Sequence, residues 1–284
     1  MKAAVAIPTQ NRASYLDVAL ASLAPQVDAL DGVELLVVDD GGSDATPEVA
    51  ARHGARCVRH AVGRGLNAAR NTALAETEAE LVLFVDDDVE APAGFVAAML
   101  EGAARHPEAG CLTGPIRARF DGYQPRLCGR EGAPVTELDL GPEDREAPHA
   151  WGANMTVRRS AVEQVGPFDD GLQLYGDEQE WQDRLHAAGG KIVYVAAAGL
   201  DHRRAGADAR VSSLCRAARR RGRAARREDV AKGQAPALAH ELRVLAGTLL
   251  HGPRFRCANG PIMSAHSLGR IEEALRARRG GGAA

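Results

Sequence analysis

Three consecutive aspartates, Asp86, Asp87 and Asp88, follow directly after the apolar run LVLFV at residues 81–85. Adjacent carboxylates repel one another, so at the end of a buried segment they need a positive partner. Mg²⁺ and Mn²⁺ bind one or two carboxylates together with phosphate oxygens and water. The triplet therefore predicts a divalent-cation site facing a diphosphate, with a solvated turn that caps the next helix as the alternative.

A second acidic pair, Asp39 and Asp40, follows the apolar run VELLVV at residues 33–38. In open α/β sheets, ligands bind at the carboxyl ends of the strands. Both acidic clusters follow predicted strands, so we expect them to lie at one ligand-binding edge. The alternative for Asp40 is that it only begins the turn GGSD.

The elements that must position these aspartates alternate along the chain. Wholly apolar strands separated by helices favour a parallel sheet that is covered on both faces. We therefore predict the α/β class, with a single doubly wound, mainly parallel sheet and helices on both faces. The expected strands are 3–7, 33–38, 55–59, 81–85 and 191–196, and helices are expected around 16–23, 46–54, 65–77, 92–105, from 158, and at 177–188.

The remaining segments differ in character. Residues 116–150 are rich in Gly, Pro and charge without periodicity, which predicts an irregular excursion or a small β insertion. From residue 207 onward the pattern is helical. We predict three parts: a nucleotide-binding domain at 1–204, a helical C-terminal extension at 205–278 and a disordered tail at 279–284.

Composition excludes several classes of protein. The 284 residues are 45% hydrophobic with a net charge of -3, which argues against nucleic-acid binding. The sequence contains no run of about 18 apolar residues, so no membrane-spanning helix is predicted. The apolar stretch at the start is too short for a signal peptide. The cysteines form no CxxC pair, which favours reduced thiols in a cytoplasmic protein and argues against a zinc site. They are Cys57, Cys111, Cys128, Cys215 and Cys257.

Arginines crowd residues 203–227. Three interpretations are open: contact of Arg203 or Arg204 with a diphosphate, peripheral contact with an anionic membrane or phosphorylated acceptor, or an ordinary solvated helix, which we favour. The sequence contains no feature that indicates the oligomeric state.

Six motifs in order resemble the family 2 glycosyltransferases with the GT-A fold, over about residues 3–204. They are VAIPTQNRASYL, LLVVDDGGSDAT, GRGLNAARNTAL, LFVDDDV, WGANMTVRRSAVEQVGPFD and YGDEQEWQDRLHAAGGKIVYV. The resemblance implies a GT-A nucleotide-sugar-binding and catalytic domain. In the usual Pro-Thr-Tyr-Asn run, the tyrosine is replaced here by Gln10.

The resemblance implies a set of nucleotide-binding residues, and one of the aspartates after the second strand would accept the imide N–H of a uracil-like base. Arg70 has an alternative role as a structural ion-pair partner of the aspartate triplet. The implied set is Pro8, Thr9, Asp39, Asp40, Gly65, Arg70, Asp86 and Asp87.

The resemblance also implies metal ligands and a catalytic base. Asp86 and Asp88 match the Asp-x-Asp pattern, and His202 in GLDHRR matches a histidine that ligates the metal in several GT-A enzymes, with a surface histidine as the alternative. The family's Glu-Asp pair is inverted, so Glu178 occupies the position of the base and Asp177 its neighbour. The alternative is an acidic first helical turn stabilised by the helix dipole.

Trp151, Gly152 and Asn154 lie where the family builds its sugar and acceptor pocket, although a tryptophan so near a strand can be core. The implied function is metal-dependent, inverting transfer of a sugar from a nucleoside diphosphate sugar, with a UDP-sugar favoured, Mn²⁺ or Mg²⁺ as cofactor and an unidentified acceptor. The alternatives are a nucleotidyltransferase and a catalytically silent nucleotide-sugar-binding protein.

Overall fold

The structure, a computed structural model, describes residues 2–172 and 177–280. The chain divides into two compact units, each of which is considered by itself. The first contains the described residues of Met1–Ala118, Thr136–Gln173 and Asp177–Arg203, and the second those of Arg119–Val135 and Arg204–Ala284. The segment Arg119–Val135, which the sequence analysis assigned to the first domain, groups with the C-terminal helices.

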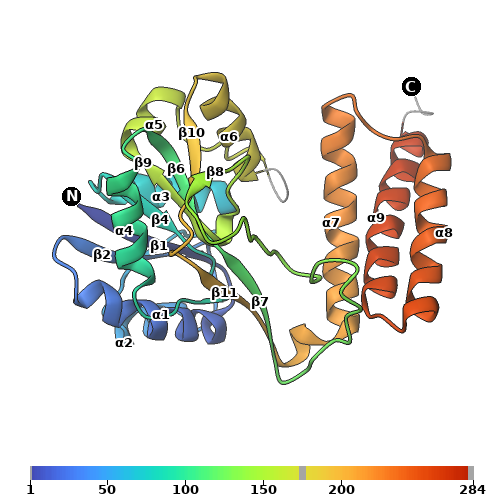
Figure 1. The fold of residues 1–284 in the computed structure, drawn as a ribbon, viewed down its shortest axis with the longest axis horizontal. Coiled ribbons are helices and arrows are strands. Elements are labelled where there is room, and N and C mark those ends of the chain that lie inside the picture. The colour runs from blue at the N-terminus through green and yellow to red at the C-terminus, as the bar shows by residue number, and fades with distance from the viewer. Residues whose placement is uncertain (1, 173–176, 281–284) are drawn as a thin grey trace. The chain divides into compact units, whose positions relative to one another are not determined.

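Among the described residues, the first unit is built on an eight-stranded sheet in the order β3-β2-β1-β4-β9-β6-β10-β8 (Figure 1). The strands β1 to β4 are mutually parallel, and β10 is parallel to β6. This arrangement confirms the predicted mainly parallel, doubly wound sheet. The strands are β1 (Ala3–Thr9), β2 (Val33–Asp39), β3 (Arg56–Arg59), β4 (Leu81–Phe84), β6 (Ala109–Thr113), β8 (Arg145–Glu146), β9 (Met155–Arg158) and β10 (Lys191–Tyr194).

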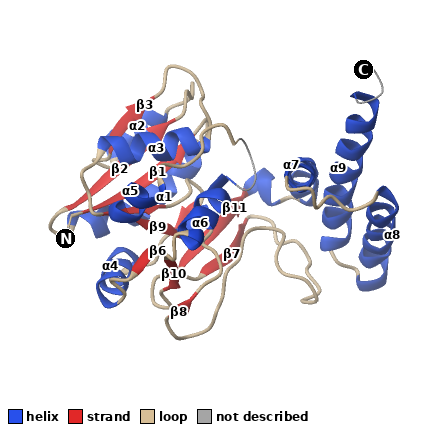
Figure 2. Ribbon diagram, turned by 90° about the horizontal axis from the view of Figure 1, so that it is seen from above, coloured by secondary structure: helices blue, strands red, loops and turns tan. Residues whose placement is uncertain are grey.

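Helices cover both faces of this sheet (Figure 2). On one face α1 packs against α2 and α4, and on the other α6 packs against α3 and α5. Because apolar side chains meet helices on both sides, β1 is buried along its whole length. The helices are α1 (Ala13–Asp28), α2 (Thr46–Arg52), α3 (Leu66–Glu76), α4 (Phe95–Arg105), α5 (Arg159–Val165) and α6 (Asp177–Ala187).

Strand β9 runs antiparallel between β4 and β6, with Met155 opposite Phe84 and Arg158 opposite Leu81. An antiparallel strand begins at the edge where its parallel neighbours end. The residues that precede β9, including the 3₁₀ turn Gly152–Asn154, therefore reach the carboxyl edge of the sheet.

A smaller sheet orders β5 (Val89–Glu90), β11 (Leu200–Ala205) and β7 (Ile116–Asp121). Its strand β7 and a bridge between Ile116 and Leu138 supply the small β insertion that the irregular 116–150 segment predicted.

In the second unit, α7 (Val211–Ala231), α8 (Leu238–Phe255) and α9 (Asn259–Gly280) form the predicted helical extension. Helix α9 packs closely on α7, and glycines at the contact allow this approach. A methyl group on Gly222 would overlap the carbonyl of His266, and a methyl group on Gly269 would overlap the carbonyl of Arg219. Helix α9 also continues past the predicted start of the tail at residue 279, and residues 281–284 lie outside the described part. None of the helices in the described ranges is long and apolar enough to cross a membrane.

The arginines of α7 form ion pairs with acidic side chains of α9 and α8. Arg219 and Arg223 both pair with Glu272. Arg270 of α9 in turn contacts Glu241 at 2.8 Å and Asp229 at 2.6 Å. These ion pairs balance part of the arginine charge of α7 locally.

Candidate active site

The loops that follow β1, β2 and β4 leave the sheet at one edge. Thr9 is the register partner of Asp39, and Ala6 is the partner of Phe84. Because these strands are parallel, both acidic clusters and the loop after β1 meet at the carboxyl edge, as predicted. Pro8 itself lies buried within β1, opposite Val38.

Asp87, in the middle of the triplet, faces the loop after β1. Thr9 Oγ1 donates a hydrogen bond of 2.7 Å to Asp87 Oδ2, and Arg12 Nη1 lies 2.6 Å from Asp87 Oδ1. The second guanidinium nitrogen, Arg12 Nη2, lies 2.8 Å from Asp88 Oδ2. Arg12 is therefore a cation that the acidic triplet required, and the sequence analysis did not assign it. Its only signal was an arginine in the loop after the first strand.

Asp86, Asp88 and His202 form a cluster whose potential ligand atoms all lie within 4.8 Å of one another. His202 Nε2 is 3.1 Å from Asp88 Oδ1, and both side chains are buried. The pairing of His202 with Val89, in β11 and β5, places the imidazole beside the triplet. The predicted metal ligands are thus brought together, and His202 is not a surface histidine.

The second nitrogen of the imidazole constrains its protonation. His202 Nδ1 lies 3.3 Å from the carbonyl oxygen of Thr136, and because a carbonyl can only accept, a hydrogen bond here requires the proton on Nδ1. In the neutral ring, the lone pair of Nε2 then faces the carboxylate of Asp88. A cation between these two groups would stabilise the arrangement, as in carboxylate and histidine metal sites.

The electrostatics of the triplet agree with this need for positive charge. Burial raises the pKa of Asp86, and the charge of Asp88 raises it further. Burial also raises the pKa of Asp87, against the opposing effect of Arg12. Burial lowers the pKa of Arg12, but Asp87 and Asp88 outweigh that effect, so the pKa is raised above its ordinary value and the guanidinium stays charged.

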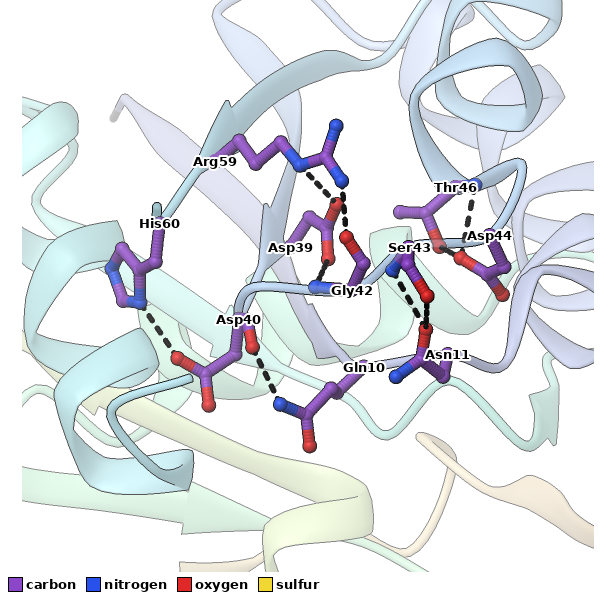
Figure 3. Close-up of polar contacts among 10 residues, drawn as sticks. All are labelled: Gln10, Asn11, Asp39, Asp40, Gly42, Ser43, Asp44, Thr46, Arg59 and His60. Atoms are coloured by element: carbon purple, nitrogen blue, oxygen red, sulfur yellow. Dashed lines mark hydrogen bonds and ion pairs between the residues drawn. The ribbon is translucent and has the colours of Figure 1, made fainter. Parts of the chain in front are cut away.

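Asp40 holds together the loops at the end of β2 (Figure 3). His60 Nδ1 lies 2.7 Å from Asp40 Oδ1, and the backbone N–H groups of Arg64 and Gly65 each donate to the same carboxylate at 2.8 Å. Gln10 Nε2, at the position of the family tyrosine, donates to the Asp40 carbonyl at 2.7 Å. The N–H group of Gly65, at the start of α3, is thus directed to Asp40 rather than to open space.

Asp39 is fully buried and adjoins the same loops. Its Oδ1 accepts a hydrogen bond of 2.8 Å from the N–H of Gly42, and its Oδ2 lies 3.1 Å from Arg59 Nε (Figure 3). The pair Asp39 and Asp40 therefore fixes the shape of the loop that the sequence analysis expected at the nucleotide base.

Arg70, Gly152 and Glu178 meet beside the triplet. Arg70 is 2% exposed, and its Nη1 lies 3.7 Å from Glu178 Oε2 and donates to Asn67 Oδ1 at 3.0 Å. The N–H of Gly152 donates to Glu178 Oε1 at 3.4 Å. A methyl group on Gly152 would overlap the guanidinium of Arg70 and would lie 3.8 Å from Asp86 Oδ1. The predicted base is thus brought next to the predicted metal ligands.

Asp177, the alternative base, begins α6, but its side chain lies outside the described part of the chain. Trp151 is half-buried. Its ring packs edge-on against that of His149, with the two ring planes at 76° and their centroids 4.7 Å apart. Asn154 is buried and donates to the carbonyl of Ala198 at 2.9 Å, so its amide anchors the turn. Its Oδ1 has no hydrogen-bond partner among the described residues.

Sequence comparison identifies relatives. The pattern of the family described as glycosyl transferase family 2 matches residues 4–166. A pre-mycofactocin glycosyltransferase of Mycobacterium tuberculosis is 31% identical over 212 residues, which cover 70% of this chain and 42% of that protein. An N-acetylglucosaminyl-diphospho-decaprenol L-rhamnosyltransferase of the same species is 30% identical over 237 residues, covering 69% of this chain and 74% of the relative. The chain thus spans less than half the length of the first of these relatives.

Solved structures share the fold. A mannosyltransferase from Pyrobaculum calidifontis in complex with GDP-Man and Mn²⁺ aligns with a TM-score of 0.59 and 18% identity, covering 100% of this chain and 75% of that one. GalNAc-T7 with UDP, GalNAc and Mn²⁺ also gives a TM-score of 0.59, at 16% identity, over 79% of this chain and 47% of its own. The chain has the GT-A fold, and with the match over residues 4–166 it belongs to glycosyl transferase family 2.

Proposed function

We propose that this chain catalyses the metal-dependent transfer of a sugar from a nucleoside diphosphate sugar, with UDP favoured as the nucleotide, to an acceptor that is not yet identified. The observation that carries the proposal is the convergence of the cluster Asp86, Asp88 and His202 with the pair Arg70 and Glu178 at one edge of the sheet. The complexes of the two structural neighbours with nucleotides and Mn²⁺ support it.

The donor atoms of Asp86, Asp88 and His202 fit Mn²⁺ or Mg²⁺. Carboxylate oxygens suit both ions, and neutral imidazole suits Mn²⁺ better than Mg²⁺. Asp88 can serve such a site while it keeps Arg12, because Oδ2 contacts Arg12 and Oδ1 faces His202. When bound, the ion would supply positive charge against the negative charge that grows on the departing diphosphate.

The reaction must also remove the proton of the acceptor hydroxyl. In an inverting displacement, the acceptor oxygen bonds to the anomeric carbon as the bond to the diphosphate breaks, and the acceptor hydroxyl loses its proton. Glu178 is proposed to accept that proton. Arg70 Nη1 lies 3.7 Å from Glu178 Oε2 and helps to hold the carboxylate in position. Asp177 is the alternative base, because the base of the family's Glu-Asp pair is the aspartate and the inverted pair places that residue type at position 177.

Nucleotide preference is proposed to arise from the loop after β2. If Asp39 or Asp40 accepts the imide proton of uracil, UDP should bind more tightly than ADP or CDP. A buried group left unpaired costs about 1–3 kcal/mol, or on the order of 10-fold to 100-fold in affinity. Equal calorimetric affinities for the three nucleotides would show that neither carboxylate selects the base.

The proposal is tested by thermal shift with UDP-, GDP- and dTDP-sugars, with and without Mn²⁺. A donor present at 100 times its dissociation constant stabilises the native state by about 2.7 kcal/mol. Asp88→Asn should abolish the Mn²⁺-dependent part of the shift and lower turnover by orders of magnitude. The matched control is Asp31→Asn, at an exposed aspartate between α1 and β2, which should behave as the wild type.

The outcomes separate the alternatives. Undiminished Mn²⁺-dependent binding in Asp88→Asn would reject the metal assignment. Donor binding without sugar transfer or donor hydrolysis across a panel of acceptors would favour a silent nucleotide-sugar-binding protein. Release of pyrophosphate from a nucleoside triphosphate and a sugar phosphate would favour a nucleotidyltransferase.

A further inference from the structure

Three side chains with metal-binding chemistry meet in the second unit, and the proposed sugar transfer uses none of them. The ligand atoms of Cys128, His251 and Cys257 all lie within 4.8 Å of one another. Cys257 is buried, and the other two are half-buried. The cysteines do not have the sequence spacing of a metal site, so the sequence did not predict one, and the fold alone brings them together.

We propose that Cys128, His251 and Cys257 bind Zn²⁺, with water or an external ligand in the fourth position. Tetrahedral zinc with Zn–S near 2.3 Å and Zn–N near 2.0–2.1 Å separates sulfur from nitrogen by about 3.6 Å. The distance from Cys128 Sγ to His251 Nε2 is 3.4 Å. A zinc ion therefore fits between these atoms with only small movements of the side chains.

Backbone N–H groups point at both sulfurs, and a thiolate, the form that ligates zinc, can accept such hydrogen bonds. The N–H of Cys128 donates to Cys257 Sγ at 3.2 Å. The N–H of Arg130 donates to Cys128 Sγ. Backbone N–H groups directed at both sulfurs are outer-shell partners of the kind that orient metal ligands.

The position of His251 is also fixed. Its ring meets that of Phe255 at a centroid distance of 4.9 Å and an angle of 62°. The guanidinium of Arg130 lies 4.4 Å from the Phe255 ring centroid, and that of Arg254 lies 5.2 Å away. The stack limits rotation of the phenyl ring, and the ring in turn supports the imidazole that faces Cys128.

The zinc ion would link residues 126–132, an irregular segment, to the turn between α8 and α9. The N–H of Ala258 donates to the carbonyl of Arg126 at 2.8 Å, and Asn259 Nδ2 donates to the carbonyl of Gly132 at 2.9 Å. These two hydrogen bonds flank Cys128 on the segment. Zinc would add bonds between the same two parts of the chain at Cys128, and so would further restrain residues 126–132, which contain no helix or strand.

The test uses the full chain, reduced and stripped of metal, and titrated with Co²⁺ as a spectroscopic substitute for Zn²⁺. Thiolate ligation gives a ligand-to-metal charge-transfer band that the cluster of Asp86, Asp88 and His202 cannot give, because it contains no sulfur. We expect a band that saturates at one equivalent of Co²⁺ and is displaced by Zn²⁺. Cys128→Ser and Cys257→Ser should lose most of its intensity, whereas Cys215→Ser, on α7 outside the cluster, should retain it.

A second measurement does not depend on the folding of the variants. Alkylation of the wild-type thiols, resolved by residue with mass spectrometry, should slow at least 10-fold at Cys128 when Zn²⁺ is added, with Cys215 as the internal control. The absence of a charge-transfer band in the reduced wild type would overturn the proposal, as would alkylation that is unchanged by Zn²⁺. A Cys128–Cys257 disulfide whose reduction yields thiols that bind no Co²⁺ would also overturn it.

Discussion

Replacement of Arg12 by glutamine should destabilise the first unit, and a divalent cation should reverse the loss. The guanidinium lies 2.6 Å from Asp87 Oδ1 and 2.8 Å from Asp88 Oδ2, and these two carboxylate side chains are only 5% and 4% exposed. A hydrogen bond to a charged group contributes about 1.5–3 kcal/mol. Because the Arg12 side chain is itself 36% exposed, water screens part of this, and we expect a total loss of about 2 kcal/mol.

For a unit of this size the loss corresponds to a Tm lowered by about 4–8 °C. Mn²⁺ should then raise the Tm of Arg12→Gln more than that of the wild type, because the positive guanidinium on the other oxygen of Asp88 no longer repels the ion. If the affinity for the ion rises about 10-fold, the additional stabilisation is about 1.4 kcal/mol, or an extra ~3–6 °C.

The assay is differential scanning calorimetry near pH 8, with and without Mn²⁺. The pH is chosen because loss of Arg12 raises the pKa of Asp87 further, and protonation of Asp87 at lower pH would hide part of the effect. The control is Arg64→Gln, the same substitution at an exposed arginine whose distance to Asp170 is 4.0 Å. Equal Mn²⁺ shifts in wild type and Arg12→Gln, or an unchanged Tm without Mn²⁺, would show that Arg12 does not hold the triplet.

Three further outcomes are expected. Glu178→Gln keeps the hydrogen-bonding shape but removes basicity, so kcat should fall by about 10²–10⁴ with donor affinity unchanged, and near-normal kcat would exclude Glu178 as the base. Gly152→Ala should displace the buried guanidinium of Arg70 and lower kcat by on the order of 10-fold to 100-fold, whereas Gly247→Ala, into open space, should leave kcat as in the wild type. Asp44 accepts from the N–H groups that begin α1 and α2, and although burial opposes this effect, these bonds lower its pKa. A lowered folded pKa means that its contribution of about 1 kcal/mol is present above the unfolded pKa near 3.9 and is lost as the pH falls through the folded pKa. Urea denaturation of Asp44→Ala should therefore differ from the wild type at pH 7, and the difference should shrink as the pH falls below about 3.9.

Much of the fold could be predicted from local patterns. The apolar runs at 3–7, 33–38 and 81–85 correspond to β1, β2 and β4, because wholly apolar strands between helices can be buried only in a sheet that is covered on both faces. The carboxyl-edge position of Asp39 and of the triplet follows from the parallel direction of these strands.

Pairings between distant segments could not be predicted in the same way. The antiparallel insertion of β9 brings Gly152 to Arg70, and the pairing of β11 with β5 brings His202 to Asp88. A register of this kind depends on the whole sheet and leaves no periodicity in the individual strand.

The sequence by itself determined which residue types stand at strand ends, and therefore that three carboxylates at 86–88 needed positive charge at a sheet edge. Only the tertiary structure decided which groups supply it: Arg12 at Asp87 and Asp88, together with the proposed cation position bounded by Asp88 and His202. The physical reason is that Coulomb attraction falls with distance in space and is indifferent to separation along the chain, whereas sequence patterns report only on neighbours in the chain. The cluster of Cys128 with His251 likewise could not be predicted from the sequence, since its members share no local motif and meet only in the fold.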